Sequence, residues 1–217
     1  EFRRVLFRSD TGEFYTPRAV TQFIIDMVNP KLGDKITDPA CGTAGFLVCA
    51  IEHLKKQVKN IDDRKTLQET VTGSELKPLP FMLSVINLIT HDIEVPQILN
   101  GDSLSREYNS IRQKDRVDII VANPPFGGVV ADGVETNFPL NYRTKESADL
   151  FLILFIQLLK EGGRAGIVLP DGSLTGDGVK QRVRQKLLED CNVHTIVRLP
   201  QSVFAPYATV NTNLIFF

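Results

Sequence analysis

The chain has 217 residues, of which 42% are hydrophobic, so it can bury the core of one large globular domain. Its formal net charge of −1 excludes a uniformly basic nucleic-acid coat, but it leaves room for a local basic patch or for a partner that supplies positive charge. The three cysteines lack metal-ligand spacing, which indicates free thiols in a reducing cytoplasm and no metal site.

The length and the hydropathy pattern of the sequence predict one domain without a membrane anchor. The longest apolar run, residues 149–159, is too short to cross a bilayer and is expected to form a buried helix. No signal peptide is visible, so a cytoplasmic location is expected. Residues 1–9 show no periodicity and are interpreted as a cloning or assembly remnant, which leaves residues 10–217 as the domain.

Short apolar strands alternate with amphipathic helices along the chain. The first helix is expected to begin with Thr16 as its cap and Pro17 as its first residue, and to stop at Asn29. Further strands are expected at 35–37, 70–74, 97–99, 117–122, 164–169, 193–199 and 213–217, with helices at 44–58, from 80, at 148–160 and at 179–188. This alternation predicts an α/β fold with a mostly parallel sheet flanked by helices, in which ligands bind beyond the carboxyl ends of the strands.

The first strand leads into a loop that is suited to a small ligand. Residues 38–46 read Asp-Pro-Ala-Cys-Gly-Thr-Ala-Gly-Phe, and Gly42 and Gly45 let the backbone pass close to a ligand at a helix N-terminus. A dinucleotide fingerprint would need a third glycine where Ala40 stands. A smaller, partly charged nucleotide-like or carboxylate-bearing ligand is therefore favoured over a pyrophosphate.

Acidic residues follow the next two strands. Glu75 is placed to accept hydrogen bonds from ribose hydroxyls, and Asp102 can accept an amino proton from an adenine ring. Asp102 alone is a weak signal, because Asp is a common turn former. Three successive strand ends that carry a glycine-rich loop, Glu75 and Asp102 predict a cofactor site together.

The fourth strand ends in Asn123-Pro124-Pro125-Phe126. The prolines stiffen the backbone, and the Asn123 amide oxygen with the Pro124 carbonyl gives two fixed acceptors for one amino group. Such acceptors favour the tetrahedral geometry that an aromatic amine needs in order to attack, without a titrating base. The Phe126 ring can stack on a flat heterocycle.

Together these motifs resemble the S-adenosylmethionine-dependent amino-methyltransferases of DNA. The loop from Asp38 to Leu47 resembles their cofactor loop, and Asn123 to Phe126 resembles their amino-methylation motif. The segment from Gly12 to Arg18 resembles the N-terminal cofactor segment of their N6-adenine members. Residues 10–217 as a whole are most similar to the modification (M) subunit of type I restriction-modification systems.

The resemblance implies a Rossmann-like class I fold with S-adenosyl-L-methionine as the cofactor. Asn123 and Pro124 would receive the N6 group of a flipped adenine, with Phe126 on its face. The cofactor-binding residues implied are Tyr15, Thr16, Asp38, Ala40, Gly42 and Gly45 for the methionine part, Glu75 for the ribose, and Asp102 with Ser103 for the adenine.

The resemblance also implies partners and a larger protein. The partners are double-stranded DNA, a specificity (S) subunit and a restriction (R) subunit, and the chain is expected to be a fragment of a longer subunit. Residues 127–133 would be a mobile flap over the pocket. Phe204 is expected in the core or the pocket wall, and the basic stretch from Lys180 to Lys186 on a solvated face or at a DNA or partner contact.

Three alternatives remain open at this point. The same aromatic-flanked Asn-Pro-Pro motif would suit methylation of a protein glutamine or of a guanine amino group in RNA. An inactive binding or assembly module could keep the fold without turnover. A nucleotide-dependent oxidoreductase is disfavoured by the missing glycine at Ala40.

Overall fold

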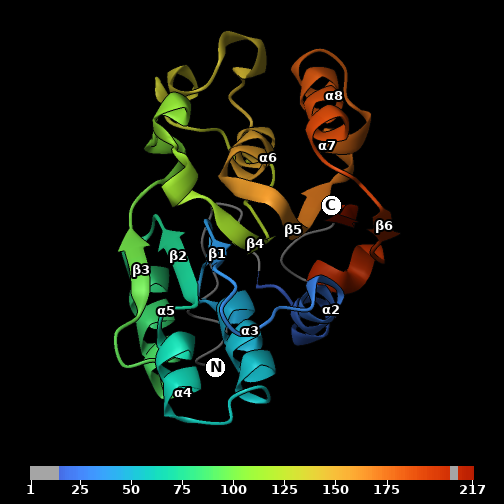
Figure 1. The fold of residues 1–217 in the computed structure, drawn as a ribbon. Coiled ribbons are helices and arrows are strands. Elements are labelled where there is room, and N and C mark those ends of the chain that lie inside the picture. Colours follow the sequence, from blue (N-terminus) through green and yellow to red (C-terminus); the bar gives the residue numbers. More distant parts are fainter. Residues whose placement is uncertain (1–14, 206–209) are drawn as a thin grey trace.

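Residues 15–205 and 210–217 are described by a computed structural model, which contains one seven-stranded sheet between two layers of helices (Figure 1). The strands are β1 (Ile36–Asp38), β2 (Val71–Glu75), β3 (Gln97–Asn100), β4 (Val117–Ala122), β5 (Leu159–Pro170), β6 (Thr195–Arg198) and β7 (Thr212–Phe216). Their order in the sheet is β3-β2-β1-β4-β5-β7-β6. Strands β1 to β5 pair in parallel, whereas β7 is antiparallel to both β5 and β6.

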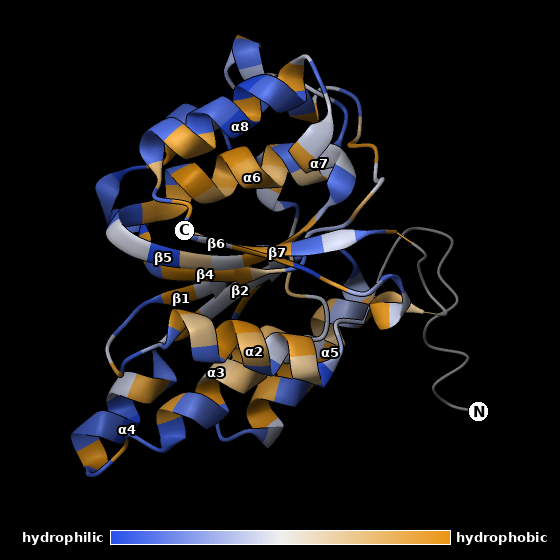
Figure 2. Ribbon diagram, turned by 90° about the vertical axis from the view of Figure 1, so that its right-hand side faces the viewer, coloured by the Kyte–Doolittle hydropathy of each residue, from blue (hydrophilic) through white to orange (hydrophobic). Residues whose placement is uncertain are grey.

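The helices divide between the two faces of this sheet (Figure 2). One layer contains α2 (Arg18–Val28), α3 (Gly45–Lys55), α4 (Ile61–Gln68) and α5 (Pro78–Thr90), and the other contains α6 (Ser147–Leu158), α7 (Asp171–Thr175) and α8 (Val179–Asp190). Short 3-10 turns lie at Ser103–Ser105, Tyr108–Ser110, Gln113–Asp115, Val134–Asn137, Leu140–Tyr142 and Gln201–Phe204. The apolar helix α6 lies between the sheet and the more polar α8 (Figure 2).

Two hydrophobic cores form because side chains alternate along each central strand. In β4, Ile119 and Val121 pack with α2 and α3, whereas Ile120 and Ala122 pack with α6. A strand that is buried on both faces reads as a continuous apolar run, as β4 does. The predicted α/β fold with a mostly parallel sheet is therefore confirmed.

The first helix differs from its prediction. Helix α2 begins at Arg18, with Pro17 in the cap position and no side-chain cap, so the prediction of Thr16 as the cap is wrong. Its C-terminus is as expected: Asn29 adopts a left-handed conformation with φ of 44°, and its N–H donates to the carbonyl of Ile25. The Thr16 hydroxyl oxygen instead accepts a hydrogen bond from the side chain of Asn123, the residue after β4.

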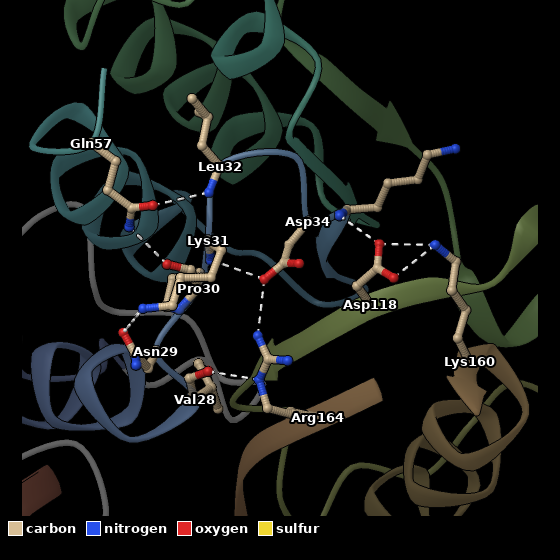
Figure 3. A network of polar contacts seen from close by, with 11 residues as sticks. Val28, Asn29, Pro30, Lys31, Leu32, Asp34, Gln57, Asp118, Lys160 and Arg164 are labelled. Atoms are coloured by element: carbon tan, nitrogen blue, oxygen red, sulfur yellow. Dashed lines mark hydrogen bonds and ion pairs between the residues drawn. The ribbon is translucent and has the colours of Figure 1, made fainter. Parts of the chain in front are cut away.

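Polar contacts tie the amino-terminal edge of the sheet together (Figure 3). The Arg164 guanidinium donates to the Val28 carbonyl at 2.8 Å and to Asp34 at 2.9 Å. Asp118 accepts from Lys160 Nζ and from the Lys35 N–H, each at 2.8 Å. The polar side chains at this edge are paired with one another and with the backbone. The residues predicted for the site lie at the opposite, carboxyl edge of the sheet.

Candidate active site at the carboxyl edge of the sheet

The glycine-rich loop after β1 leaves open space along its backbone. Gly42 has φ of +54°, and Ala44 is also left-handed at +65°. A Cβ built at Gly42, Gly45 or Gly101 would meet no atom within 4 Å. The loop and the end of β3 therefore offer the kind of open cradle into which a bound molecule can fit.

Glu75 joins this loop to the end of β2. Its carboxylate accepts from the Gly42 N–H at 2.9 Å and from the Lys77 N–H at 2.8 Å, while the Cys41 N–H donates to the Ser74 carbonyl. A carboxylate is an acceptor of the kind that ligand hydroxyls can donate to. The structure thus places Glu75 at the end of β2, as predicted, and in contact with the glycine loop, while its role toward a ribose stays a prediction.

Asp38 is buried at the root of the loop, with 1% of its surface exposed. One of its oxygens accepts from the Ala40 N–H at 3.0 Å. Burial raises the pKa of the Asp38 carboxyl to about 8, the Ala40 hydrogen bond lowers it in part, and the nearby Glu75 carboxylate raises it again. Asp38 is therefore mostly protonated at neutral pH in this structure.

The end of β3 is also drawn to the loop. The Ser103 hydroxyl donates to the Pro39 carbonyl at 2.7 Å, which fixes the β3 end beside the β1 loop. Asp102 accepts from the Leu104 N–H at 2.9 Å and from the Ser105 hydroxyl at 3.3 Å, so it caps its own 3-10 turn. The structure therefore brings three predicted strand ends together, and a role of Asp102 or Ser103 toward an adenine ring stays a prediction.

The amide of Asn123 is anchored on one side and free on the other. Its Nδ2 donates to the Thr16 hydroxyl oxygen at 2.9 Å, across 107 residues of sequence. Its Oδ1 is buried and has no hydrogen-bond partner within the described residues. An unpaired buried acceptor costs free energy, which a bound ligand or an ordered water would recover by donating a hydrogen bond to it.

Phe126 lies in the core beside this amide. Its side chain is 6% exposed and meets Phe204 edge-on, with the ring centroids 5.9 Å apart and the planes at 75°. Phe204 is 2% exposed, so it is a core residue that packs against Phe126. Stacking of Phe126 on a target base stays a prediction.

Ser147 is a residue of this region that the sequence did not indicate. Its hydroxyl donates to the Pro125 carbonyl at 2.9 Å, and its N–H donates to the Gly128 carbonyl at 3.0 Å. A Cβ at Gly128 would come within 2.9 Å of the Ser147 hydroxyl oxygen. The first residue of α6 thus fixes the turn after Asn123, and the only sequence signal was a serine ahead of an apolar helix.

The glycine-rich stretch 127–133 is hydrogen-bonded to the segment before α6. The Val130 N–H donates to the Lys145 carbonyl at 2.9 Å, and Lys145 Nζ pairs with Asp132 at 2.6 Å. Its predicted movement as a flap is untested. Tyr15, the first described residue, is 51% exposed, and Gly12, Glu13 and Phe14 lie outside the described residues.

The basic stretch on α8 makes contacts within the chain. Lys180 pairs with Glu146 at 2.6 Å and with the buried Asp149 at 3.1 Å. Arg182 donates to the Asn141 carbonyl, Arg184 to the Ser173 carbonyl, and Lys186 pairs with Asp190. These contacts favour a structural role for this helix face.

Residues 15–205 and 210–217 contain no group of three or more His, Cys, Asp or Glu side chains placed to hold a metal ion. No helix among them is long and apolar enough to cross a membrane. Cys41, Cys49 and Cys191 are free thiols, and Cys41 and Cys49 are buried.

Comparison with solved structures defines the class of protein. The chain superposes with a TM-score of 0.71 on a Listeria monocytogenes chain described as a class I S-adenosylmethionine-dependent methyltransferase, at 21% identity over 93% of this chain and 59% of that one. At this identity the likeness shows the fold alone. The chain therefore has the Rossmann-like fold of the class I methyltransferases.

Sequence comparison then gives the family. The N-6 DNA Methylase family model matches residues 7–217, so the chain belongs to this family. It is 52% identical over 210 residues to the type I restriction enzyme EcoEI methylase subunit of Escherichia coli, covering 96% of this chain and 42% of that subunit. The crystal structure of the EcoKI M protein superposes with a TM-score of 0.85 at 30% identity, covering 96% of this chain and 44% of that one. The chain thus spans less than half the length of these relatives.

Proposed function

We propose that the chain transfers a methyl group from S-adenosyl-L-methionine to the N6 amino group of adenine in DNA. The observation that supports this most is the Asn123 amide, which offers a buried, unpartnered Oδ1 at the end of β4, in the sheet that also carries the glycine cradle. The family and the 52% identity to a type I methylase subunit support the same reaction.

The residues of the cradle fit the proposed cofactor. Open space at Gly42, Gly45 and Gly101 can receive it, Glu75 can accept from its ribose hydroxyls, and Asp38 lies at the root of the same loop. When bound there, the cofactor would supply an electrophilic methyl group. Tyr15, Thr16, Ala40, Asp102 and Ser103 are the further residues that we assign to this site by resemblance.

The chain's own residues would act on the target amine. Asn123 Oδ1 and the Pro124 carbonyl would each accept one N–H of the adenine N6 group, drawing its protons out of the ring plane. The nitrogen lone pair then leaves conjugation with the ring and can attack. Methyl transfer would leave a positive charge on N6 and release the demethylated cofactor as a neutral thioether. One N6 proton would then pass to solvent water, so no titrating base is required at Asn123. The adenine must leave the DNA stack to reach this position.

We further propose that the chain works as part of the modification subunit of a type I restriction-modification complex in the cytoplasm. The supporting relatives are methylase subunits of type I restriction enzymes, and the chain covers 42% of the EcoEI subunit. A specificity subunit would supply sequence recognition of double-stranded DNA, and a restriction subunit would complete the complex. The near-neutral charge of the chain is consistent with a partner that supplies DNA affinity.

The experiment compares three methyl acceptors side by side. A full-length methylase subunit that carries these 217 residues, assembled with its specificity subunit, is given methyl-labelled cofactor with adenine-containing DNA, ribosomal RNA or a release factor. We expect label in DNA alone, and nuclease digestion of that DNA should show the label on N6 of adenine. Label only in protein or only in RNA would overturn the proposal, and so would a protein that binds cofactor without transferring label to any acceptor.

A further inference from the structure

Helix α5 has the composition of a buried helix and the exposure of a surface helix. It lies beside the edge strand β3 (Figure 1), and it contains no charged residue. The comparably apolar α6 buries every residue from Ser147 to Ile156, whereas α5 buries only Ser84 and Leu88 against the described part of the chain. A helix that is apolar on every side is normally buried. The outer face of α5 therefore lacks a covering element among residues 15–205 and 210–217.

The exposed apolar side chains of α5 form a single stripe. Four large side chains on its outer face are 50–57% exposed, namely Leu79, Met82, Ile86 and Ile89. Intervals of three, four and three residues bring them onto one line along the helix, which we call the α5 stripe. The same intervals separate the a and d positions of a coiled coil, where one helix packs against another. The α5 stripe therefore fits a second helix that has an apolar face of its own.

The area of the α5 stripe decides between a linked and a separate occupant. A helix of 13 residues is about 20 Å long, so a stripe about 10 Å wide covers roughly 200 Å². A stable complex of separate proteins buries about 800 Å² on each partner, and it must offset the lost freedom of two molecules. A segment of the same chain is held at a high effective concentration and requires far less contact area. The α5 stripe is therefore large enough for an intrachain contact and too small by itself for a second copy or a separate subunit.

The relatives of this chain contain enough further sequence to supply such a segment. The matched region is 42% of the EcoEI methylase subunit and 44% of the EcoKI M protein, so more than half of each lies outside it. We propose that, in the full-length methylase subunit, a helix from outside these 217 residues packs its apolar face on the α5 stripe. This contact belongs to the assembly of the subunit, so it is expected whichever acceptor the site methylates.

A first measurement asks whether the α5 stripe is covered. Met82 is oxidised with dilute hydrogen peroxide in the full-length subunit without its specificity subunit, and the same subunit unfolded in urea gives the reference rate. Free methionine added to both samples corrects for the activity of the oxidant. Because a covered thioether is shielded, we expect Met82 sulfoxide to form at least about fivefold more slowly in the folded subunit.

An uncovered Met82 would behave differently. Its side chain is 57% exposed in the described structure, so its oxidation would slow by only about twofold on folding. A reduction smaller than fivefold would overturn the proposal. Protection that arises only when the specificity subunit is added would overturn it as well.

A second measurement identifies the occupant. The photoreactive residue p-benzoylphenylalanine replaces Ile86 in one variant and Leu188 in the matched control, because Leu188 is an apolar side chain on α8 that is also exposed. Equal amounts of isotopically light and heavy full-length subunit are mixed with the specificity subunit and irradiated. Mass spectrometry then identifies the crosslinked peptides.

The crosslinked peptides distinguish the possible occupants of the α5 stripe. From position 86 we expect a crosslink within one subunit, to a peptide from outside these 217 residues, and from position 188 we expect no crosslink to that peptide. Crosslinks from position 86 that join light to heavy subunits would assign the stripe to a second copy, and those that reach the specificity subunit would assign it to that partner. Either result would overturn the proposal, and so would crosslinks confined to these 217 residues or the absence of any crosslink from position 86.

Discussion

At the scale of single residues, Asp38 gives the chain a distinct pH dependence. Burial raises the pKa of this carboxyl from its ordinary value near 3.8 to about 8, while the unfolded chain retains the ordinary value. Between those values the folded state holds a proton that the unfolded state has lost. Stability from this group is therefore fully present below about pH 4 and is lost as pH rises through about 8.

Asp38→Asn removes this dependence and keeps an oxygen that can accept from the Ala40 N–H. We expect the free energy of unfolding of the parent, relative to Asp38→Asn, to fall by up to about 1.4 kcal/mol per pH unit between pH 5 and 8. The difference should level off above that range. Urea unfolding at several pH values measures it, and a difference that stays constant with pH would contradict a protonated Asp38.

Site residues could be predicted where a strand end and a motif coincide. Glu75 and Asn123 were assigned from the sequence because each stands at the carboxyl end of an expected strand, and the structure places both at the carboxyl edge of the sheet. Ser147 was not, because its role depends on a contact with Pro125, 22 residues earlier. The engagement of Thr16 with Asn123, across 107 residues, was equally beyond a local pattern.

At the scale of elements, the packing of α2 on the sheet depends on a glycine in β5. A Cβ at Gly166 would lie 2.7 Å from Ile24 Cγ2 and 3.0 Å from Val28 Cγ1, both on α2. Gly166→Ala should therefore lower the free energy of unfolding by about 1–3 kcal/mol through overpacking. Gly172→Ala is the control, because the nearest atom to its Cβ is Lys180 Nζ at 4.0 Å. Equal stability of the two variants in urea would show that α2 does not pack here as described.

The elements that could not be predicted from the sequence lack a clear periodic pattern of apolar residues. Helix α4 buries only Leu67 and is held by its Asn60 cap, so no apolar stripe marks it. Strand β5 begins at Leu159, five residues before its predicted start, because Lys160-Glu161-Gly162-Gly163 resembles a turn. In the structure this segment belongs to β5, and the register of the β4–β5 pairing shifts between Val117 and Ile119.

At the scale of the whole molecule, the alternation of strands and helices was sufficient to predict the layered α/β fold. It was not sufficient to predict the direction of every strand. Helices connect the parallel neighbours β1 to β2, β2 to β3 and β4 to β5, whereas the connection from β3 to β4 contains only short 3-10 turns. The antiparallel insertion of β7 between β5 and β6 depends on tertiary pairing, such as Ile167 with Ile215, which no local pattern encodes. The predicted site residues at strand ends lie in the parallel half, so their common edge could be anticipated, whereas the direction of the last strand could not.

The central claim is that the Asn123 amide accepts the adenine amine during methyl transfer. The most direct measurement is mass spectrometry of nucleosides from DNA treated with the full-length subunit, its specificity subunit and S-adenosylmethionine, for the parent and Asn123→Ala. We predict N6-methyladenine with the parent, and at least about 100-fold less with Asn123→Ala, at cofactor affinity within about threefold of the parent. N6-methyladenine formed by Asn123→Ala at the parent's rate, or methylation by the parent at another base, would contradict the account.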